Sequence, residues 1–395
     1  MVEFLPFRGL IPSLKGNEKI DDRVSPPYDV ISPEQLVRYR SSPFNVTNIT
    51  LGGNDGDYSE AGRRLESWLS GGHLVQEPEP YFYLYEQEFL EDGVLLNRKG
   101  LVGVLKAEGY SPDGVIPHEE TFSNVKEDRL NLLKGTETHC ESIFGLVDEM
   151  SFLNSISPEK MFEFRDEDGV SHRMYRIHSQ HDIDMVRTAL SKKRMLIADG
   201  HHRYETACRY ALENPRDPLK GYVLATIVST DDPGLVVRPT HRLVGGMNIE
   251  DEQLLVALSL DFALSRATSL DDLLERMRSS GGRDLGLYTR SGMSILLRPK
   301  SDGEGALGSL DAYKCEELII KPLVHRRKGW RVAYDHDSKS AAERTRRGDY
   351  DFAILLSAPR LSTIWEVAMS SKKMPKKSTY FWPKIWSGLV YYRMK

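Results

Sequence analysis

Five consecutive residues, Asp199-Gly200-His201-His202-Arg203, are the strongest candidates for a functional site in this sequence. They follow a short apolar run typical of a buried strand and precede a segment typical of a helix. The first backbone N–H groups of a helix have no partner within it and mark the positive end of its dipole, so they attract anions. Gly200 allows close approach of the backbone to a ligand, and Arg203 can bind a phosphate through two parallel hydrogen bonds. The segment predicts a phosphate-binding turn.

The polar side chains of this turn allow more specific roles. His201 and His202 add hydrogen-bond donors beside the predicted phosphate. Asp199 could orient a histidine or hold a Mg²⁺ ion that bridges phosphates. A simpler interpretation stays open, in which Asp199 caps the helix and the histidines are exposed; two histidines and an arginine in one turn favour the functional one.

A second polar segment, His118-Glu119-Glu120-Thr121, precedes a charged stretch with helical character. A kinase acting on a hydroxyl group needs a carboxylate near the acceptor to take its proton. In the charged stretch, Lys126 and Arg129 lie three residues apart and share one helical face, where they could neutralise phosphate charge. An exposed polar loop and helix would explain the same residues.

The closing stretch Pro375-Lys376-Lys377-Ser378-Thr379, with Lys384 shortly after it, concentrates positive charge on a Pro-bounded loop. Its lysines and hydroxyls could reach phosphates if the loop folds back over the site. An exposed basic tail is the alternative. The aromatic residues that follow, Tyr380, Phe381 and Trp382, favour a packed loop.

Two further segments are candidates for contact with a substrate. The two prolines in Pro26-Pro27-Tyr28-Asp29 impose extended geometry and hold Tyr28 and Asp29 on a stiff loop. These residues could line a substrate pocket, although a rigid structural turn is equally compatible. His241, in Thr240-His241-Arg242, is a candidate for a cleft between domains.

The elements that must position these residues indicate a mixed α/β (α+β) fold. Apolar positions at helical spacing, short β-rich runs and the hairpin chemistry of Glu91-Asp92-Gly93 are the signals. The expected helices span residues 59–69, 124–134, 204–212, 251–258 and 270–278. The expected strands span residues 81–89, 99–106, 142–147, 194–198, 222–229, 286–289, 293–297 and 352–356. With 395 residues the chain suits two domains, which we place at 1–235 and 236–395 because a Pro/Gly loop lies near the boundary.

Composition excludes several classes of protein. The net charge of −5 leaves no global basic field for nucleic acid or anionic lipid. The three cysteines form no CxxC pair, no apolar run is long enough to span a membrane, and no signal peptide is evident, so a cytoplasmic protein is expected. HExxH, Walker A and GxGxxG motifs that open a helix do not occur, which excludes those metal and nucleotide sites.

The phosphate-binding turn carries a family resemblance. The pattern Gly-x-x-Arg-Tyr-x-x-Ala, filled by Gly200, Arg203, Tyr204 and Ala207, resembles the phosphate turn of the ParB/sulfiredoxin superfamily. The fuller Asp-Gly-His-His-Arg form resembles that of the free-serine kinases in that superfamily. Nearly the whole chain also resembles a family of long proteins of unknown function that carry this turn. His201 stands where sulfiredoxins have their reactive cysteine, so reductase chemistry is not expected.

The resemblance implies a ParB/sulfiredoxin-like module within the 1–235 region and a nucleotide-dependent phosphotransferase acting on a small hydroxylated metabolite, with free L-serine as the specific candidate. ATP or ADP would be the phosphoryl donor, Mg²⁺ the cofactor and Glu119 the base. A nucleotide hydrolase or phosphatase with the same site, and a ParB-like nucleotide-binding regulatory protein, are the alternatives. No nucleic-acid or membrane partner is expected, and the oligomeric state is open.

Overall fold

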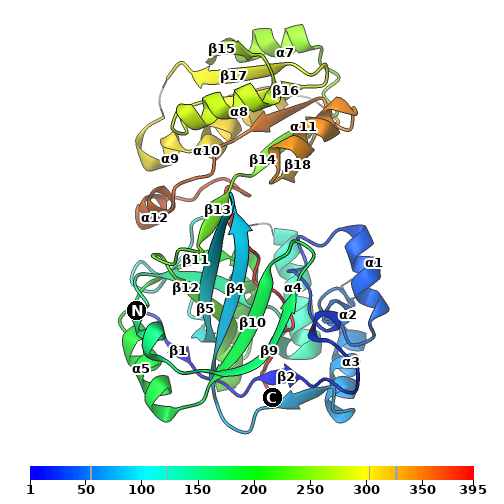
Figure 1. Ribbon diagram of the computed structural model, residues 1–395, viewed down its shortest axis with the longest axis vertical. Helices are drawn as coiled ribbons and strands as arrows, with labels where there is room; N and C mark the ends of the chain where they lie inside the picture. Colours follow the sequence, from blue (N-terminus) through cyan, green and yellow to red (C-terminus); the bar gives the residue numbers. More distant parts are fainter. Residues whose placement is uncertain (54–55, 122, 302, 325–327) are drawn as a thin grey trace. The chain divides into compact units, whose positions relative to one another are not determined.

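The computed structural model describes residues 1–53, 56–121, 123–301, 303–324 and 328–395, and it confirms a mixed α/β protein (Figure 1). The chain divides into two compact units. Unit 1 comprises Met1–Pro117, Thr121–Val236 and Pro383–Lys395, whereas unit 2 comprises His118–Glu120 and Val237–Trp382.

Unit 1 is built on a nine-stranded sheet with the strand order β6-β11-β8-β12-β5-β4-β10-β9, to which β1 adds at β5. Most neighbours are antiparallel, but β12 and β8 are parallel, as are β11 and β6. The bounds are β1 (Phe4–Leu5), β4 (Phe82–Glu91), β5 (Val94–Lys106), β6 (Val115–Ile116), β8 (Ile143–Val147), β9 (Glu159–Arg165), β10 (Ser171–Ile177), β11 (Met195–Asp199) and β12 (Tyr222–Ser229).

The hairpin between β4 and β5 follows from its turn residues. Asp92 and Gly93 both have positive φ, of 48° and 79°. A two-residue turn with positive φ at both positions matches the right-handed twist of the flanking strands, and an Asp-Gly pair adopts it readily. The predicted hairpin therefore forms where the sequence placed it.

Alternate residues of this sheet face two different layers. Phe82 and Leu84 join a buried apolar core to which α5 (Gln180–Leu190) and α6 (His201–Glu213) contribute. Tyr83 points the other way, with its ring 5.4 Å from that of Phe7. This alternation is the period-two geometry of a strand that is covered on both faces.

A second apolar core of unit 1 surrounds α3 (Ser59–Ser70), which buries Leu65 and Trp68. Unit 1 also contains the helices α1 (Pro33–Ser41), α2 (Thr47–Thr50) and α4 (Ser123–Thr136). Two short strand pairs join β2 (Leu10–Pro12) to β3 (Leu74–Gln76) and β7 (Thr138–His139) to β21 (Tyr392–Arg393). Three 3-10 turns complete it: Ile20–Asp22, Ser151–Ser155 and Pro218–Gly221.

Unit 2 contains a six-stranded antiparallel sheet with the order β15-β17-β16-β19-β14-β18. The bounds are β14 (His241–Gly245), β15 (Phe262–Ala267), β16 (Leu285–Thr289), β17 (Ser294–Pro299), β18 (Arg331–Asp335) and β19 (Phe352–Leu355). A separate pair joins β13 (Val236–Arg238) to β20 (Tyr380–Trp382).

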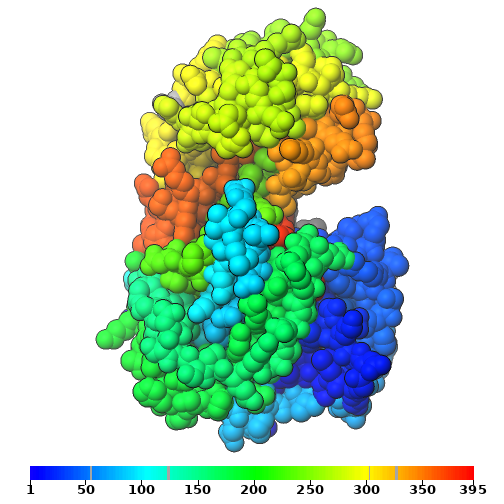
Figure 2. Space-filling view, in the orientation of Figure 1, coloured from blue at the N-terminus to red at the C-terminus, as the bar shows by residue number. Residues whose placement is uncertain are grey.

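Helices cover both faces of this second sheet. Ala353 and Leu355 face α8 (Leu270–Ser279) and α11 (Ser338–Arg346), and the outer surface of α8 is exposed in the view of Figure 2 (yellow-green). Phe352 and Ile354 face the opposite core, which contains α7 (Asp251–Leu258) and the π-helix Glu316–Val324. Three short helices, α9 (Gly305–Ser309), α10 (Asp311–Cys315) and α12 (Leu361–Met369), complete unit 2.

The division of the chain differs from the expected split at 235/236 in two respects, the first being that His118–Glu120 belong to unit 2. The sequence analysis placed all of 236–395 in one domain, but residues 383–395 belong to unit 1. Leu389, Val390 and Tyr391 are buried there, and Tyr391 exchanges backbone hydrogen bonds with Leu10 at 2.9 Å. Within the described part of the chain, no helix has the length and apolar character needed to cross a membrane.

Candidate functional site

The turn between β11 and α6 has the strand–glycine–helix form that the sequence predicts. β11 ends at Asp199, Gly200 is the N-cap residue with φ 92° and ψ 27°, and α6 begins at His201. The N-cap position is thus Gly200, one residue after Asp199, where the simpler interpretation placed the cap. A β-carbon at position 200 would also lie 3.1 Å from Nε of Arg203, so glycine is favoured by both backbone conformation and space.

The Asp199 carboxylate at this turn faces two cations. Lys384 donates from Nζ to Asp199 Oδ2 at 2.5 Å, and the Arg203 guanidinium lies 3.6 Å from Oδ1. Arg203 also donates to the carbonyl oxygen of Ser142. Burial would lower the pKa of Arg203, but the nearby carboxylates outweigh it and hold that pKa above its usual range. Arg203 is therefore a charged group, with 11% of its side chain exposed, that protein atoms engage in this structure.

A second arginine lies in the same unit and shares a carboxylate with this group. Glu141, which is 6% exposed, raises the pKa of Arg203 through its negative charge and lies 3.7 Å from Arg129. It also accepts from the backbone N–H of Tyr28 and from the Ser387 hydroxyl, both at 3.2 Å.

The guanidinium of Arg129 is placed by its own contacts. It stands 4.3 Å from the centre of the Tyr28 ring and donates to the carbonyl oxygen of Thr50 at 3.0 Å and to Tyr58 Oη at 2.8 Å. We name the set Tyr28, Asp29, Arg129, Glu141, Asp199, Arg203 and Lys384 the turn cluster. Asp29 joins it through its electrostatic effect on Arg203.

The turn cluster includes residues that the sequence analysis missed or assigned differently. Glu141 was missed, because an isolated glutamate between Cys140 and Ser142 carries no motif. Lys384 was noted only as part of a basic stretch, and its partner Asp199 lies almost two hundred positions earlier in the chain. The cluster brings three cations together with three carboxylates, and Asp128 adds a fourth carboxylate at Arg129.

The two histidines of the turn have different surroundings. His201 is 7% exposed, whereas His202 is only half-buried. The pair is thus not simply exposed, as the simpler interpretation of the turn required.

Lys126 and Arg129, which were expected to present one basic face to phosphate, have separate carboxylate partners. Lys126 lies 3.0 Å from Glu205 Oε2, which also accepts from Thr121 Oγ1 at 3.0 Å. Arg129 pairs with Asp128 and Glu141 instead.

A second group of predicted residues comes together in unit 2. The segments His118–Glu120 and Met374–Thr379 lie side by side: Glu119 and Met374 form a parallel bridge, and Met374 N–H donates to the carbonyl oxygen of His118 at 2.8 Å. Glu119 accepts from the backbone N–H of Lys377 at 2.5 Å and from Thr379 Oγ1 at 3.4 Å. We name His118, Glu119 and Lys376–Thr379 the loop cluster.

In the loop cluster, a short chain of hydrogen bonds connects His118 to the Glu119 carboxylate. His118, which is fully buried, lies with Nε2 3.0 Å from Thr379 Oγ1. Because that hydroxyl donates to Glu119, it accepts from His118. The carbonyl oxygen of Lys376 accepts from Arg242 at 3.3 Å, and Ser378 is 4% exposed, so this stretch is packed and is no exposed tail.

His241 does not belong to the loop cluster. Its Nδ1 accepts from the backbone N–H of Leu356 at 3.1 Å, and its ring lines a cavity in unit 2.

The residues present do not fit a protein-held Mg²⁺ ion at Asp199. Magnesium sites use one or two carboxylates together with phosphate oxygens and water. The Asp199 carboxylate is instead occupied by Lys384 and Arg203, whose positive charges repel a cation. Among the described residues, no group of three histidine, cysteine or acidic side chains could hold a metal ion. The metal role expected for Asp199 is therefore not supported.

Comparison with known proteins gives a family for this chain. The model of the family described as "Protein of unknown function (DUF1015)" matches residues 4–313, so the chain belongs to that family. No curated protein matches it.

Among solved structures, the chain is similar to a conserved hypothetical protein from Pyrococcus furiosus (14% identity, 70% of this chain and 90% of that chain, TM-score 0.39). It is also similar to a free serine kinase in complex with AMP (14% identity, 69% of this chain and 85% of that chain, TM-score 0.39). A third is SbnI with a C-terminal truncation from Staphylococcus aureus (9% identity, 72% of this chain and 84% of that chain, TM-score 0.39). Likenesses this distant carry no argument about function.

Proposed function

We propose that this chain is a nucleotide-dependent phosphotransferase that binds nucleotide phosphates at the 199–203 turn and acts on a small hydroxylated metabolite. One observation carries the proposal: an oxyanion, the Asp199 carboxylate, is already held by Lys384 and Arg203 beside the start of α6. A phosphate oxygen carries the same kind of charge and accepts the same hydrogen bonds. The resemblance of the Asp-Gly-His-His-Arg segment to free-serine kinases makes L-serine the specific candidate for the acceptor.

The position of the turn adds to the attraction for phosphate. α6 runs from His201 to Glu213, and its N-cap residue, Gly200, has no side chain to accept from the first backbone N–H groups. The partial positive charge of such a terminus adds to the charges of Lys384 and Arg203. Because Lys384 is already paired with a carboxylate, a phosphate group would take the place of Asp199 as its partner.

The reaction would proceed by transfer between oxygens. The acceptor hydroxyl oxygen bonds to the terminal phosphorus of ATP or ADP, the bond from that phosphorus to the bridging oxygen breaks, and the hydroxyl proton passes to a carboxylate. The resemblance assigns that carboxylate to Glu119, whose two oxygens are held by Lys377 N–H and Thr379 Oγ1. Positioning and charge neutralisation carry most of such a transfer.

The test is a transfer assay on the full chain, with ATP or ADP offered against L-serine and a panel of small alcohols and with phosphorus NMR as the readout. Lys384→Met removes the cation nearest Asp199 and should lower kcat/KM by about 10- to 100-fold. Lys192→Met, at an exposed lysine of unit 1, is the matched control and should leave it unchanged. Glu119→Gln should lower kcat by about 100-fold or more and leave nucleotide binding intact.

Other outcomes would replace the proposal. Loss of nucleotide with no phosphorylated acceptor would identify a hydrolase or phosphatase. Binding without turnover would favour a nucleotide-binding regulatory protein. Transfer that is equally fast in the Lys384→Met and Lys192→Met proteins would place the phosphate site elsewhere.

A further inference from the structure

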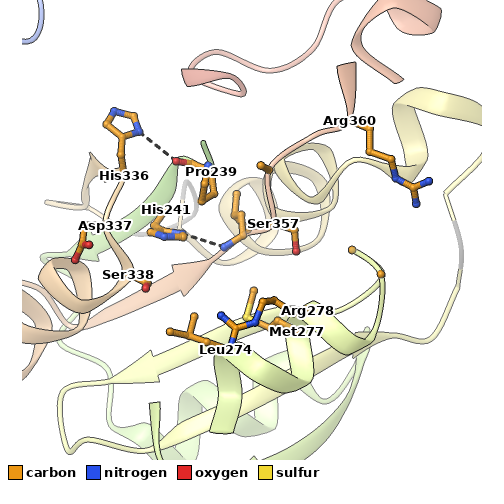
Figure 3. A pocket seen from close by; sticks show the side chains of 14 residues that line it. Pro239, His241, Leu274, Met277, Arg278, His336, Asp337, Ser338, Ser357 and Arg360 are labelled. Atoms are coloured by element: carbon orange, nitrogen blue, oxygen red, sulfur yellow. Dashed lines mark hydrogen bonds between the residues drawn. The ribbon is translucent and has the colours of Figure 1, made fainter. Parts of the chain in front are cut away.

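Unit 2 contains a cavity of about 590 Å³ that takes no part in the proposed phosphotransfer (Figure 3). It lies between α8 and the segments that lead into α11 and α12. Small-molecule sites have volumes of about 300–1,000 Å³ and are mostly apolar. Leu274 and Met277 of α8 and Leu356 after β19 supply an apolar wall here. Size and lining therefore suit the body of a metabolite-sized ligand.

His241 gives this cavity a buried hydrogen-bond donor. The residue is 3% exposed, and because its Nδ1 accepts from Leu356 N–H, the ring proton must lie on Nε2. Nε2 has no hydrogen-bond partner among the described residues. It is not among the buried atoms that lack both a partner and access to solvent, so a ligand atom could reach it. Burial lowers the pKa of His241 to about 4, so the ring is neutral near pH 7 and Nε2 remains a donor.

Arg360 is a positively charged residue of the lining, and Figure 3 shows its guanidinium directed away from His241. Its side chain is exposed and forms no ion pair with the part of the chain that the structure describes, whereas Arg278, the other arginine of the lining, pairs with Glu275 at 2.5 Å. Arg360 is also the N-cap residue of α12, a nine-residue helix that no side chain caps. A guanidinium beside an uncapped helix start favours an anionic group.

The acidic group of the lining is already engaged. Asp337 accepts from the backbone N–H of Ser340 at 2.6 Å and so caps α11. The carboxylate keeps its negative charge, and Figure 3 shows it on the opposite side of the cavity from Arg360.

A neighbouring cavity of about 290 Å³ shares Gly281, Gly282 and Arg360 with the first one. Gly281 has a φ of 67°, and no atom lies within 4 Å of the place where its β-carbon would be. Arg360 thus lines both cavities. Gly281 lines both as well, and the space beside its backbone is open.

We propose that this cavity binds a small organic anion that joins an oxyanion group, a carboxylate or a phosphate monoester, to an apolar body. The oxyanion lies beside Arg360 and the start of α12, the body packs against Leu274 and Met277, and an acceptor atom of the ligand takes the hydrogen bond of His241 Nε2. The site is independent of the proposed phosphotransfer, since none of its residues belongs to the turn cluster or the loop cluster.

The test follows the Met277 side chain directly. The full chain is labelled with ¹³C at its methionine methyl groups, and the Met277 signal is identified by its loss in Met277→Leu. Three probes with one aromatic ring each are then titrated: phenyl phosphate, benzoate and benzyl alcohol. We expect at least one of the two anions to shift the Met277 methyl signal with an affinity at least about tenfold higher than that of benzyl alcohol. The stronger of the two anions identifies the oxyanion.

A matched pair of variants locates the anion. Arg360→Ala should weaken binding of the better anion by about tenfold or more, whereas Arg346→Ala, at an exposed arginine of α11 outside both cavities, should not. Both arginines are on the surface, so neither change threatens folding. A Met277 signal that no probe shifts, equal affinity for the anions and the alcohol, or equal binding by the two variants would each overturn the proposal. None of these readouts depends on phosphotransfer.

Discussion

At the scale of single residues, the turn after β11 shows how one glycine serves two physical requirements. Gly200 adopts a left-handed conformation and lies against the guanidinium of Arg203. A residue with a β-carbon would strain the backbone and press on Arg203, whose position depends on its contacts with Ser142 and Asp199. Backbone geometry and charge placement are therefore coupled at this position.

We predict that Gly200→Ala lowers the free energy of unfolding of unit 1 by about 1–3 kcal/mol, the cost of a left-handed non-glycine residue. Gly221→Ala is the control, because nothing lies within 4 Å of its β-carbon position and its φ is not left-handed. That change should stay within about 0.5 kcal/mol. Urea unfolding followed by circular dichroism measures both, and equal effects at the two glycines would contradict the coupling.

The same scale shows how far the sequence led to the candidate site. Asp199, Gly200 and Arg203 were singled out because local chemistry marks a strand end, a turn and a helix start. Glu141 could not be found in that way. Its importance comes from contacts with Arg129 and with Tyr28 and Ser387, and the last two lie far away in the chain.

At the scale of elements, periodicity predicted most helices and strands closely, because the pattern of apolar residues is a local property. Residues 59–69 were predicted as a helix and form α3 (Ser59–Ser70), and residues 222–229 were predicted as a strand and form β12. The closing segment shows the limit of such local signals. Nothing in residues 383–395 indicates that they complete unit 1 rather than the sheet that precedes them in the chain.

We predict that a chain ending at Trp382 loses the cooperative unfolding of unit 1. Arg98, which is fully buried, donates to the carbonyl oxygen of Pro383, and Gln87 donates to that of Lys384 at 2.9 Å. Removing these acceptors leaves a buried charge without part of its partners and also removes the buried Tyr391.

The control for this truncation removes only Lys395. That residue is 41% exposed and makes surface ion pairs with Glu66 and Glu137, which contribute little to stability. Near-ultraviolet circular dichroism during urea unfolding reports the outcome. A chain of residues 1–382 that unfolds like the control would show that the closing segment is dispensable.

At the scale of the whole molecule, both units bury histidines, among them His139 in unit 1 and His241 in unit 2. Burial lowers the pKa to about 4 for His139 in unit 1 and likewise for His241 in unit 2. Since the ordinary histidine pKa is near 6.5, the unfolded chain takes up these protons first as the pH falls. The contribution of these neutral histidines to the free energy of unfolding is therefore fully present above about pH 6.5, and it is lost as the pH falls toward 4.

We predict that lowering the pH from 6.5 to 5 lowers the free energy of unfolding by about 2 kcal/mol through His139 in unit 1 and by a similar amount through His241 in unit 2. His139→Gln should remove part of the pH dependence of unit 1, where the pKa of His172 is lowered as well. His241→Gln should flatten that of unit 2. His178→Gln, at a histidine that is 53% exposed, is the control and should leave both slopes unchanged. Urea unfolding at a series of pH values tests this, and slopes that all variants share would contradict it.

The sequence by itself determined the mixed α/β class, most of the elements and the turn at 199–203, because each depends on residues that are neighbours in the chain. Only the tertiary structure decided that Lys384 reaches Asp199, that Thr379 connects His118 to Glu119, and that the closing residues complete unit 1. These pairings join segments separated by well over a hundred residues. Their specificity comes from burial and from the pairing of charges and hydrogen bonds in three dimensions, for which local periodicity carries no signal.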